Sequence, residues 1–284
     1  MIGWGASGVL AKAIDLDSLV VVAYRFWTST IIFFAFLALR GRPMSMRKFK
    51  RALPGGIGLA LDVAFFFTAI KLTAVANATV IVSMQPVVML YLSTKMLGEK
   101  VSKAQVVWSG VALVGVVVLL FGSSGLPEAN WRGDLLAAAA ILAWTAYLYY
   151  SKTTQDVLDP VEYTAATGLV AAAINTPLIF VFGQTMELPS RADLGFLALM
   201  VFGSGLAAHL LMNWSLTKIP IWVGSVMSLM IPAGATLMAW FFLDESITLL
   251  QSAGIGLTLL ALAAIALNNT SARNKADALN GVEA

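Results

Sequence analysis

Residues 82–99 read VSMQPVVMLYLSTKMLGE, and residues 228–245 read SLMIPAGATLMAWFFLDE. These segments belong to a longer correspondence, in which Phe67–Leu113 reappears 146 positions later without a gap. The matched pairs include Pro86 with Pro232, Leu97 with Leu243, Glu99 with Glu245, Gln105 with Gln251 and Gly110 with Gly256. Each copy predicts an apolar helix broken at a central proline, an acidic turn and a second apolar helix. Duplicated halves in a bilayer protein are typical of a transporter that alternates around a site between them.

The composition excludes a soluble domain. Of the 284 residues, 59% are hydrophobic and only 12% are charged, and the mean hydropathy is +0.85. A soluble chain could not cover that much apolar surface. We therefore predict an all-α integral membrane protein with ten transmembrane helices. The predicted spans are Ile2–Ala13, Ser18–Leu39, Ala52–Leu72, Val75–Leu97, Ala104–Phe121, Gly133–Tyr150, Val161–Phe182, Leu194–Ser215, Ile221–Leu243 and Leu249–Leu267.

The spans divide into two groups of five. Because five is odd, the second group enters the membrane in the opposite direction, so the two five-helix repeats are inverted. We assign residues 1–121 to the first repeat, 122–132 to the connecting loop, 133–267 to the second repeat and 268–284 to a polar, disordered cytoplasmic tail. The first run would rise only about 18 Å, against a hydrocarbon layer of about 30 Å. We therefore expect the sequence to begin inside its first helix.

The basic residues predict the orientation. With a cytoplasmic N-terminus, thirteen lysines and arginines fall on the inner side and four on the outer side. This is a firm positive-inside bias. We expect a multi-pass protein of the cytoplasmic (inner) membrane with both termini in the cytoplasm.

Several classes of chemistry lack a signature. Cysteine is absent, and we expect no metal and no cofactor. The net charge of +3 is not a nucleic-acid signal. No G-x-x-x-x-G-K-[ST] motif is present, so energy would come from a solute or proton gradient.

Two capping boxes are predicted after the acidic turns. Ser102 precedes Gln105 by three residues, and Thr248 precedes Gln251 by three, each ahead of an apolar run. Glu99 and Glu245 lie beside the same predicted helix starts, where negative charge is favourable. We interpret all of these residues as helix caps and place none of them in the transport site.

With these residues in view, the chain resembles the EamA family of the drug/metabolite transporter superfamily. The resemblance is carried by Trp4-Gly5, by Tyr24-Arg25-Phe26, by Ala74–Pro86 leading into Leu97-Gly98-Glu99, and by Ser225–Pro232 leading into Leu243-Asp244-Glu245. It implies a ten-helix inverted-repeat carrier, usually one that exports small metabolites such as amino acids or drugs. It implies no single substrate. The chain departs from the family pattern in its short first helix and in Asp244, where glycine is commoner.

Pro86 and Pro232 lie near the middle of their helices. Each lacks an N–H and frees the carbonyl four residues earlier, at Val82 and Ser228. Unpaired carbonyls at membrane depth are tolerated only against protein or a wet cavity. We predict a functional bend that lines the substrate space or flexes; a static kink is the alternative.

Asp62 and His209 are predicted to lie at the centre. Asp62 lies midway along the third span, where a carboxylate costs about 3 kcal/mol on insertion scales, and His209 is the only histidine. The repeat would place the counterpart of Asp62 one residue before His209. They could bind a substrate ammonium and carboxylate, form a proton relay, or make a structural pair.

Arg25 could bind a substrate carboxylate or phosphate, or extend outward and serve only packing. Trp144 and Tyr147 lie three residues apart and share a helical face. Asn77 and Trp214 are further polar or aromatic candidates. The predicted substrate-binding set is Asp62, His209, Arg25, Gln85, Trp144, Tyr147, Asn213 and Ser228.

These patterns predict a secondary transporter that moves a small organic metabolite, such as an amino acid or a drug-like solute, outward from the cytoplasm by alternating access around a central midplane site. A membrane-embedded enzyme is one alternative, but it would need a cluster of acidic residues and histidines at metal-ligand or general-base spacing. One histidine and one central aspartate are too few to form such a cluster. A channel or structural subunit is a third alternative. The substrate, the coupling ion, proton coupling and the oligomeric state are left open.

Overall fold

The protein is described by a computed structural model that covers residues 2–73, 75–124, 130–243 and 246–280. These residues form helices and connections, without a β-strand among them. Asp244 and Glu245 lie outside the described residues, and so does the expected capping role of Glu245. The helices are α1 (Ile2–Lys12), α2 (Ser18–Leu39), α3 (Met46–Leu72), α4 (Val75–Val82), α5 (Gln85–Met96), α6 (Lys103–Ser124), α7 (Trp131–Thr153), α8 (Pro160–Val181), α9 (Arg191–Met200), the π-helix η1 (Val201–Ala208), α10 (His209–Ser215), α11 (Ile221–Met227), α12 (Met230–Leu243) and α13 (Leu249–Asn280).

Within the described part of the chain, seven helical stretches are long and apolar enough to cross a membrane. They are Ser18–Leu39, Met46–Leu72, Lys103–Gly122, Pro160–Val181, Arg191–Ser215, Ile221–Phe241 and Leu249–Asn268. The other predicted spans correspond to α1, to α4 with α5, and to α7. α1 has only 11 residues, and the fourth predicted span is divided into segments of 8 and 12 residues. α7 has 23 residues but carries Arg132, Asp134 and Lys152.

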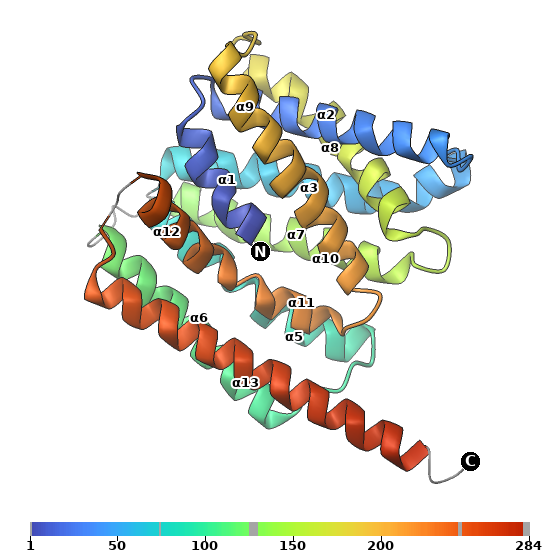
Figure 1. The fold of residues 1–284 in the computed structure, drawn as a ribbon, viewed down its shortest axis with the longest axis vertical. Coiled ribbons are helices and arrows are strands. Elements are labelled where there is room, and N and C mark those ends of the chain that lie inside the picture. Colours follow the sequence, from blue (N-terminus) through green and yellow to red (C-terminus); the bar gives the residue numbers. More distant parts are fainter. Residues whose placement is uncertain (1, 74, 125–129, 244–245, 281–284) are drawn as a thin grey trace.

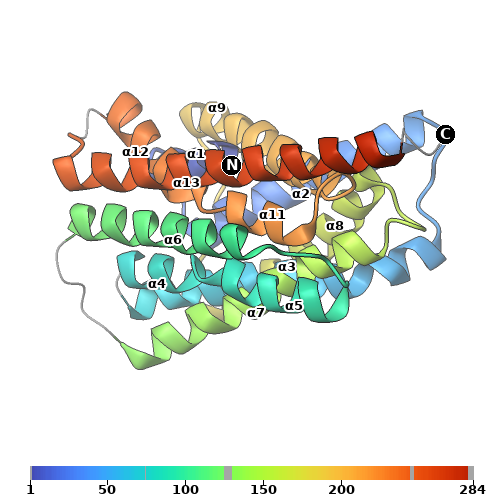
Figure 2. The ribbon, with the colours of Figure 1, turned by 90° about the horizontal axis from the view of Figure 1, so that it is seen from below.

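The two halves of the chain interleave. α3 packs on α7 and α8, α2 on α8, α1 on α12, α5 on α11 and α6 on α13, so each of these pairs joins a helix from before residues 125–129 to one from after them. The long helices run roughly along one direction (Figure 2). α6 and α13 lie side by side along one edge of the molecule (Figure 1).

α6 and α13 hold equivalent places in the sequence repeat, and they run antiparallel. Gly115 faces Thr258, while Gly122, further along α6, faces Gln251, which comes earlier in α13. The hydroxyl of Thr258 also donates to the carbonyl of Ala112 at 3.4 Å. Two matched helices of the repeat therefore point in opposite directions.

The predicted breaks at the prolines are confirmed. α4 ends at Val82 and α5 begins at Gln85, one residue before Pro86. In the second half, α11 ends at Met227 and α12 begins at Met230. Both helices are interrupted within four residues before their proline, where the missing N–H weakens the helical ladder.

The predicted capping boxes are also confirmed. The Ser102 N–H donates to Gln105 Oε1 at 2.8 Å, and the Gln105 N–H donates to Ser102 Oγ at 3.3 Å. Thr248 and Gln251 make the same reciprocal bonds at 2.7 and 3.2 Å. The local sequence fixes these helix starts, because both partners lie within one turn.

The expected place of Glu99 is wrong. Its carboxylate does not cap α6; it accepts from the Ile221 N–H at 2.9 and 3.1 Å, at the start of α11 in the other half. Lys152 binds the connection between α10 and α11, because its ammonium group donates to the carbonyls of Leu216 and Ile219 at 2.6 and 3.0 Å. Partial burial raises the pKa of Glu99, while the N–H groups and Lys152 oppose that shift. Position 99 thus fixes the start of a helix 122 residues away.

The expected disorder of the tail is wrong over its first part. α13 continues beyond the predicted end of its span at Leu267 to Asn280. Alanine, arginine, lysine and leucine between these positions are good helix formers, so the last membrane helix can extend past the apolar region.

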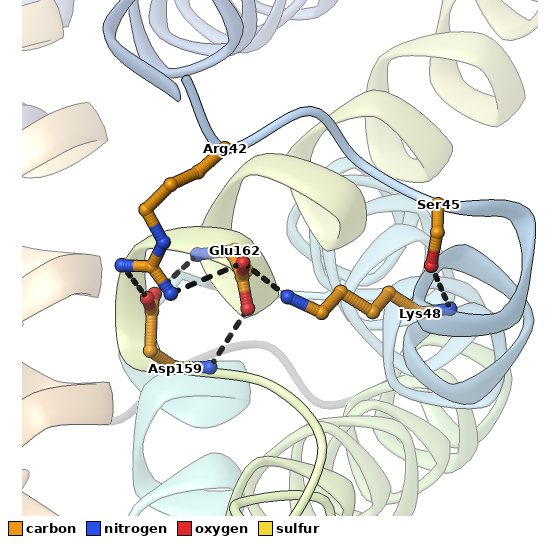
Figure 3. A network of polar contacts seen from close by, with 5 residues as sticks. All are labelled: Arg42, Ser45, Lys48, Asp159 and Glu162. Atoms are coloured by element: carbon orange, nitrogen blue, oxygen red, sulfur yellow. Dashed lines mark hydrogen bonds and ion pairs between the residues drawn. The ribbon is translucent and has the colours of Figure 1, made fainter. Parts of the chain in front are cut away.

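A cluster of charged residues ties the α2–α3 connection to the start of α8 (Figure 3). Arg42 binds Asp159 at 2.7 Å and Glu162 at 3.3 Å, and Lys48 binds Glu162 at 2.5 Å. Asp159 and Glu162 form a reciprocal capping box, with N–H donors at 2.9 and 3.1 Å. Ser45 caps α3 by accepting from the Lys48 N–H. The buried side chain of Glu162 therefore serves three donors at once.

We expect Gly254→Ala to destabilise the protein by about 1–3 kcal/mol, because helix contacts in a membrane depend on close approach. A Cβ at Gly254 would lie 2.5 Å from the Leu119 nitrogen and 2.6 Å from the Gly115 oxygen, so the backbones must move apart. A Cβ at Gly256 has nothing within 4 Å, so Gly256→Ala is the matched control. Thermal unfolding in detergent measures both. Equal midpoints for the two variants would contradict the contact.

Candidate functional site

A cavity of about 290 Å³ lies between the two halves of the chain. Its volume is near the small end of the range for ligand pockets, about 300–1,000 Å³. The lining side chains come from α1, α2, α3, α4, α5, α7, α10, α11 and α12 and from the breaks within the two proline helices. They are Trp4, Arg25, Leu59, Asp62, Val63, Phe66, Thr79, Val82, Ser83, Gln85, Pro86, Ala140, Ile141, Trp144, His209, Ser225, Ser228, Leu229, Ile231 and Pro232.

The lining follows the sequence repeat. Five lining positions between Thr79 and Pro86 have counterparts 146 positions later that also line the cavity. The pairs are Thr79 with Ser225, Val82 with Ser228, Ser83 with Leu229, Gln85 with Ile231, and Pro86 with Pro232. The broken helix of each half therefore presents the same stretch to one shared space.

Arg25 is a buried cation in the cavity wall. Its side chain is 9% exposed, and its Nη1 lies 3.4 Å from Ser204 Oγ on η1. The guanidinium carbon lies 4.9 Å from the centre of the Phe26 ring, but Nε has no hydrogen-bond partner among the described residues. Of the two alternatives for Arg25, this position does not match the one in which the side chain extends outward and serves only packing.

Asp62 lines the cavity from α3. Its charge interacts with that of Arg25, but the two side chains form no ion pair within the part of the chain that the structure describes. Asp62 is likewise not hydrogen bonded to His209, whose partner is Tyr147 at 3.3 Å. The alternative in which Asp62 and His209 form a structural pair is therefore not seen in the structure.

Aromatic rings surround His209. The ring centres of Trp4 and Trp144 lie 5.5 Å apart in an edge-to-face arrangement, and they lie 5.1 and 6.3 Å from the His209 ring. Phe26 approaches the histidine from α2 at 6.3 Å. Two tryptophans, one from each half, thus form a shared wall that favours flat or apolar ligand groups.

A buried polar cluster lies behind this wall. Asn213 donates to the Tyr147 hydroxyl at 2.8 Å and to Thr164 Oγ1 at 2.9 Å, and it accepts from Ser151 at 2.8 Å. The hydroxyl of Tyr163 donates to the carbonyl of Tyr147 at 2.6 Å. These bonds fix side chains that do not themselves line the cavity.

Gln85 and Ser225 join the two halves at the cavity surface. The Ser225 hydroxyl donates to Gln85 Oε1, while Gln85 Nε2 is buried and has no hydrogen-bond partner in the part of the chain that the structure describes. The repeat-related positions are Ile231, which matches Gln85, and Thr79, which matches Ser225. Because the isoleucine side chain is apolar, the hydrogen bond between Gln85 and Ser225 has no equivalent at this second pair of positions.

The cavity brings together most of the predicted residues. Those that line it are Asp62, His209, Arg25, Gln85, Trp144, Ser228, Pro86 and Pro232. Tyr147 and Asn213 lie in the layer behind, and Trp214 is 53% exposed on the outside of α10. The side chain of Asn77 lies outside the described residues. Thr79 and Ser225 also line the cavity and were not predicted as site residues, although both carry hydroxyl groups at matched positions of the repeat.

Both halves match one family. Residues 1–121 and residues 131–267 each match the EamA-like transporter family. The chain belongs to this family. With its apolar helices, this EamA-family protein is a multi-pass membrane protein, and several of its relatives are named as transporters or exporters.

Three relatives are informative. The uncharacterized transporter YwfM of Bacillus subtilis is 28% identical over 70% of this chain and 67% of its own length. A WAT1-related chloroplastic protein of Arabidopsis thaliana is 24% identical over 91% of this chain and 66% of its own. The aromatic amino acid exporter YddG of Ancylobacter novellus is 28% identical over 54% and 52%. One crystal structure superposes with a TM-score of 0.81, at 20% identity, over 93% of this chain and 94% of that one, which shows a common fold.

Proposed function

We propose that this EamA-family protein is a secondary transporter that exports a small zwitterionic metabolite with an apolar or aromatic side chain. The observation that carries the proposal is a cavity that is lined by matched positions of both sequence copies. A site shared by two related halves can be offered to either side of the membrane by small movements of one half against the other.

The charged groups of the cavity suggest the substrate. Arg25 and Asp62 are a base and an acid that line one space, and among the described residues no direct ion pair joins them. Burying such groups is costly unless each finds a partner. A zwitterion supplies both partners, with its carboxylate on Arg25 and its ammonium on Asp62. The tryptophan wall suits an aromatic or apolar side chain, and one relative is named an aromatic amino acid exporter.

The arrangement we propose is ten transmembrane helices in two inverted repeats, with both termini in the cytoplasm. The antiparallel course of α6 and α13 supports the inversion, and so does the interleaved packing of the halves. The charge bias of the loops supports the orientation in the inner membrane. Pro86 and Pro232 would be the points at which each broken helix bends as access changes.

Transport in proteoliposomes tests the proposal. We expect saturable counterflow of labelled tryptophan, phenylalanine or a related zwitterion, and no comparable flux of their decarboxylated or deaminated analogues. Empty liposomes are the control for leakage. Absence of saturable flux for every zwitterion in a panel of amino acids would contradict the proposal, and flux proportional to concentration would indicate a channel.

A further inference from the structure

The polar cluster behind the cavity has hydrogen-bond directions that can be assigned. The hydroxyl of Thr164 donates its only hydrogen to the carbonyl of Pro160, at 2.6 Å. Thr164 Oγ1 can therefore only accept from Asn213, at 2.9 Å, so the Asn213 atom that faces it is the nitrogen Nδ2. The Asn213 oxygen accepts from Ser151 on its other side, which agrees with that orientation.

The direction continues to the histidine. Asn213 Nδ2 gives its second hydrogen to the Tyr147 oxygen, at 2.8 Å. The Tyr147 hydroxyl hydrogen then has two acceptors within reach, His209 Nδ1 at 3.3 Å and Thr167 Oγ1, whose own hydrogen binds the Tyr163 carbonyl at 2.8 Å. When His209 Nδ1 is the acceptor it carries no proton, so the proton of the neutral imidazole lies on Nε2.

We propose that Tyr147, oriented by Asn213 and Thr164, holds His209 as the neutral Nε2–H tautomer, so that the histidine offers the cavity a fixed hydrogen-bond donor. His209 lines the cavity, and no described residue pairs with its Nε2. The ligand group that fits is an oxygen acceptor, such as a carboxylate or carbonyl oxygen.

This assignment separates two roles that the histidine could have. A donor with a fixed proton selects an acceptor on the ligand and does not carry protons across the membrane. Tyr147, Asn213 and Thr164 are then positioning residues, which act on the ligand through His209. The donor role rests on the proposed function, whereas the tautomer does not.

Nitrogen-15 NMR on the wild-type protein tests the tautomer directly. His209 is the only histidine, so selective labelling gives a single pair of ring-nitrogen signals when the affinity tag contains no histidine. At neutral pH we expect a protonated Nε2 and an unprotonated Nδ1. A protonated Nδ1 would overturn the proposal, because the Tyr147 hydroxyl would then accept from the ring and give its own hydrogen elsewhere, for example to Thr167. A ring protonated on both nitrogens would also overturn it.

Two tyrosine variants test what holds the tautomer. Tyr147→Phe removes the hydroxyl donor, and we expect the ring to lose its single tautomer. Tyr149→Phe is the matched control on the same helix, two residues away, and should leave both signals unchanged. If Tyr147→Phe also left them unchanged, Tyr147 would not be the positioning residue.

Two histidine variants test the donor role in ligand binding. Glutamine places an amide N–H near the position of Nε2, whereas asparagine reaches only the position of Nδ1. We expect His209→Gln to bind a transported zwitterion within a few-fold of wild type, and His209→Asn to weaken binding about tenfold. Equal losses in the two variants would overturn the donor role.

The NMR and the transport measurements can contradict the tautomer and the proposed function separately. The NMR signals of the ligand-free protein do not depend on what the protein transports. The expected tautomer together with no flux for any zwitterion would count against the proposed function alone. Normal flux together with a protonated Nδ1 would count against the inference alone.

Discussion

Asp62→Asn is expected to weaken the binding of a zwitterionic substrate by about 30- to 100-fold, which corresponds to roughly 2–3 kcal/mol for a buried charge-assisted hydrogen bond. The carboxylate lines the cavity without a direct ion-pair partner among the described residues, so the proposed substrate ammonium is the group that loses its contact. Binding to purified protein, followed by calorimetry or tryptophan fluorescence, measures the change. The thermal unfolding midpoint should stay unchanged, because the substitution breaks no ion pair among the described residues.

A comparison of ligands sharpens this test. Asp62→Asn should affect an amine that lacks the carboxylate but not an acid that lacks the ammonium. Arg25→Gln should show the opposite pattern, because its guanidinium is assigned to the carboxylate. Asp156→Asn is the matched control, since Asp156 is 63% exposed and far from the cavity lining. If both variants weakened both truncated ligands equally, the assignment of the two charges would be wrong.

Glu162→Ala is expected to lower the free energy of unfolding by about 2–3 kcal/mol, because it breaks a capping box and leaves two cations without their shared partner. The Glu162 side chain is 1% exposed, whereas those of Lys48 and Arg42 are 30% and 54% exposed. Water can therefore still solvate the two cations, and the loss falls below that of a fully buried pair. Thermal unfolding in detergent should show a midpoint lower by several degrees.

The exposed pair nearby supplies the control. Arg51 and Asp156 lie 3.4 Å apart, with side chains 53% and 63% exposed. Asp156→Ala should therefore cost less than about 1 kcal/mol, as exposed ion pairs do. Similar losses for Glu162→Ala and Asp156→Ala would mean that the cluster at the start of α8 contributes no more than a surface pair.

Much of the local structure was predictable. The apolar runs indicated the membrane helices, the two prolines indicated the breaks, and the capping boxes at Ser102 and Thr248 indicated two helix starts. Each of these features depends on residues within a few positions of one another. The π-helix from Val201 to Ala208 had no such signal, because its residues would also suit an α-helix.

The site was predictable where the sequence repeat pointed to it. Asp62 and His209 stand out as titratable residues inside apolar spans, and both line the cavity. Tyr147 and Asn213 were predicted to bind substrate as well, but they lie one layer behind the cavity lining. There the Asn213 amide group donates hydrogen bonds to the Tyr147 hydroxyl and to Thr164. Helical spacing places residues on a face but does not say which layer of a bundle that face meets.

Local sequence was enough to predict the helical membrane class, the two proline breaks and the capping boxes at Ser102 and Thr248, because hydropathy, proline chemistry and capping act over a few residues. Which helices meet, and what each polar group binds, is known only from the folded arrangement. Glu99 caps a helix 122 residues away, and the bond between Tyr147 and His209 spans 62 residues. Such contacts depend on how the two halves interleave, and no local pattern records that arrangement.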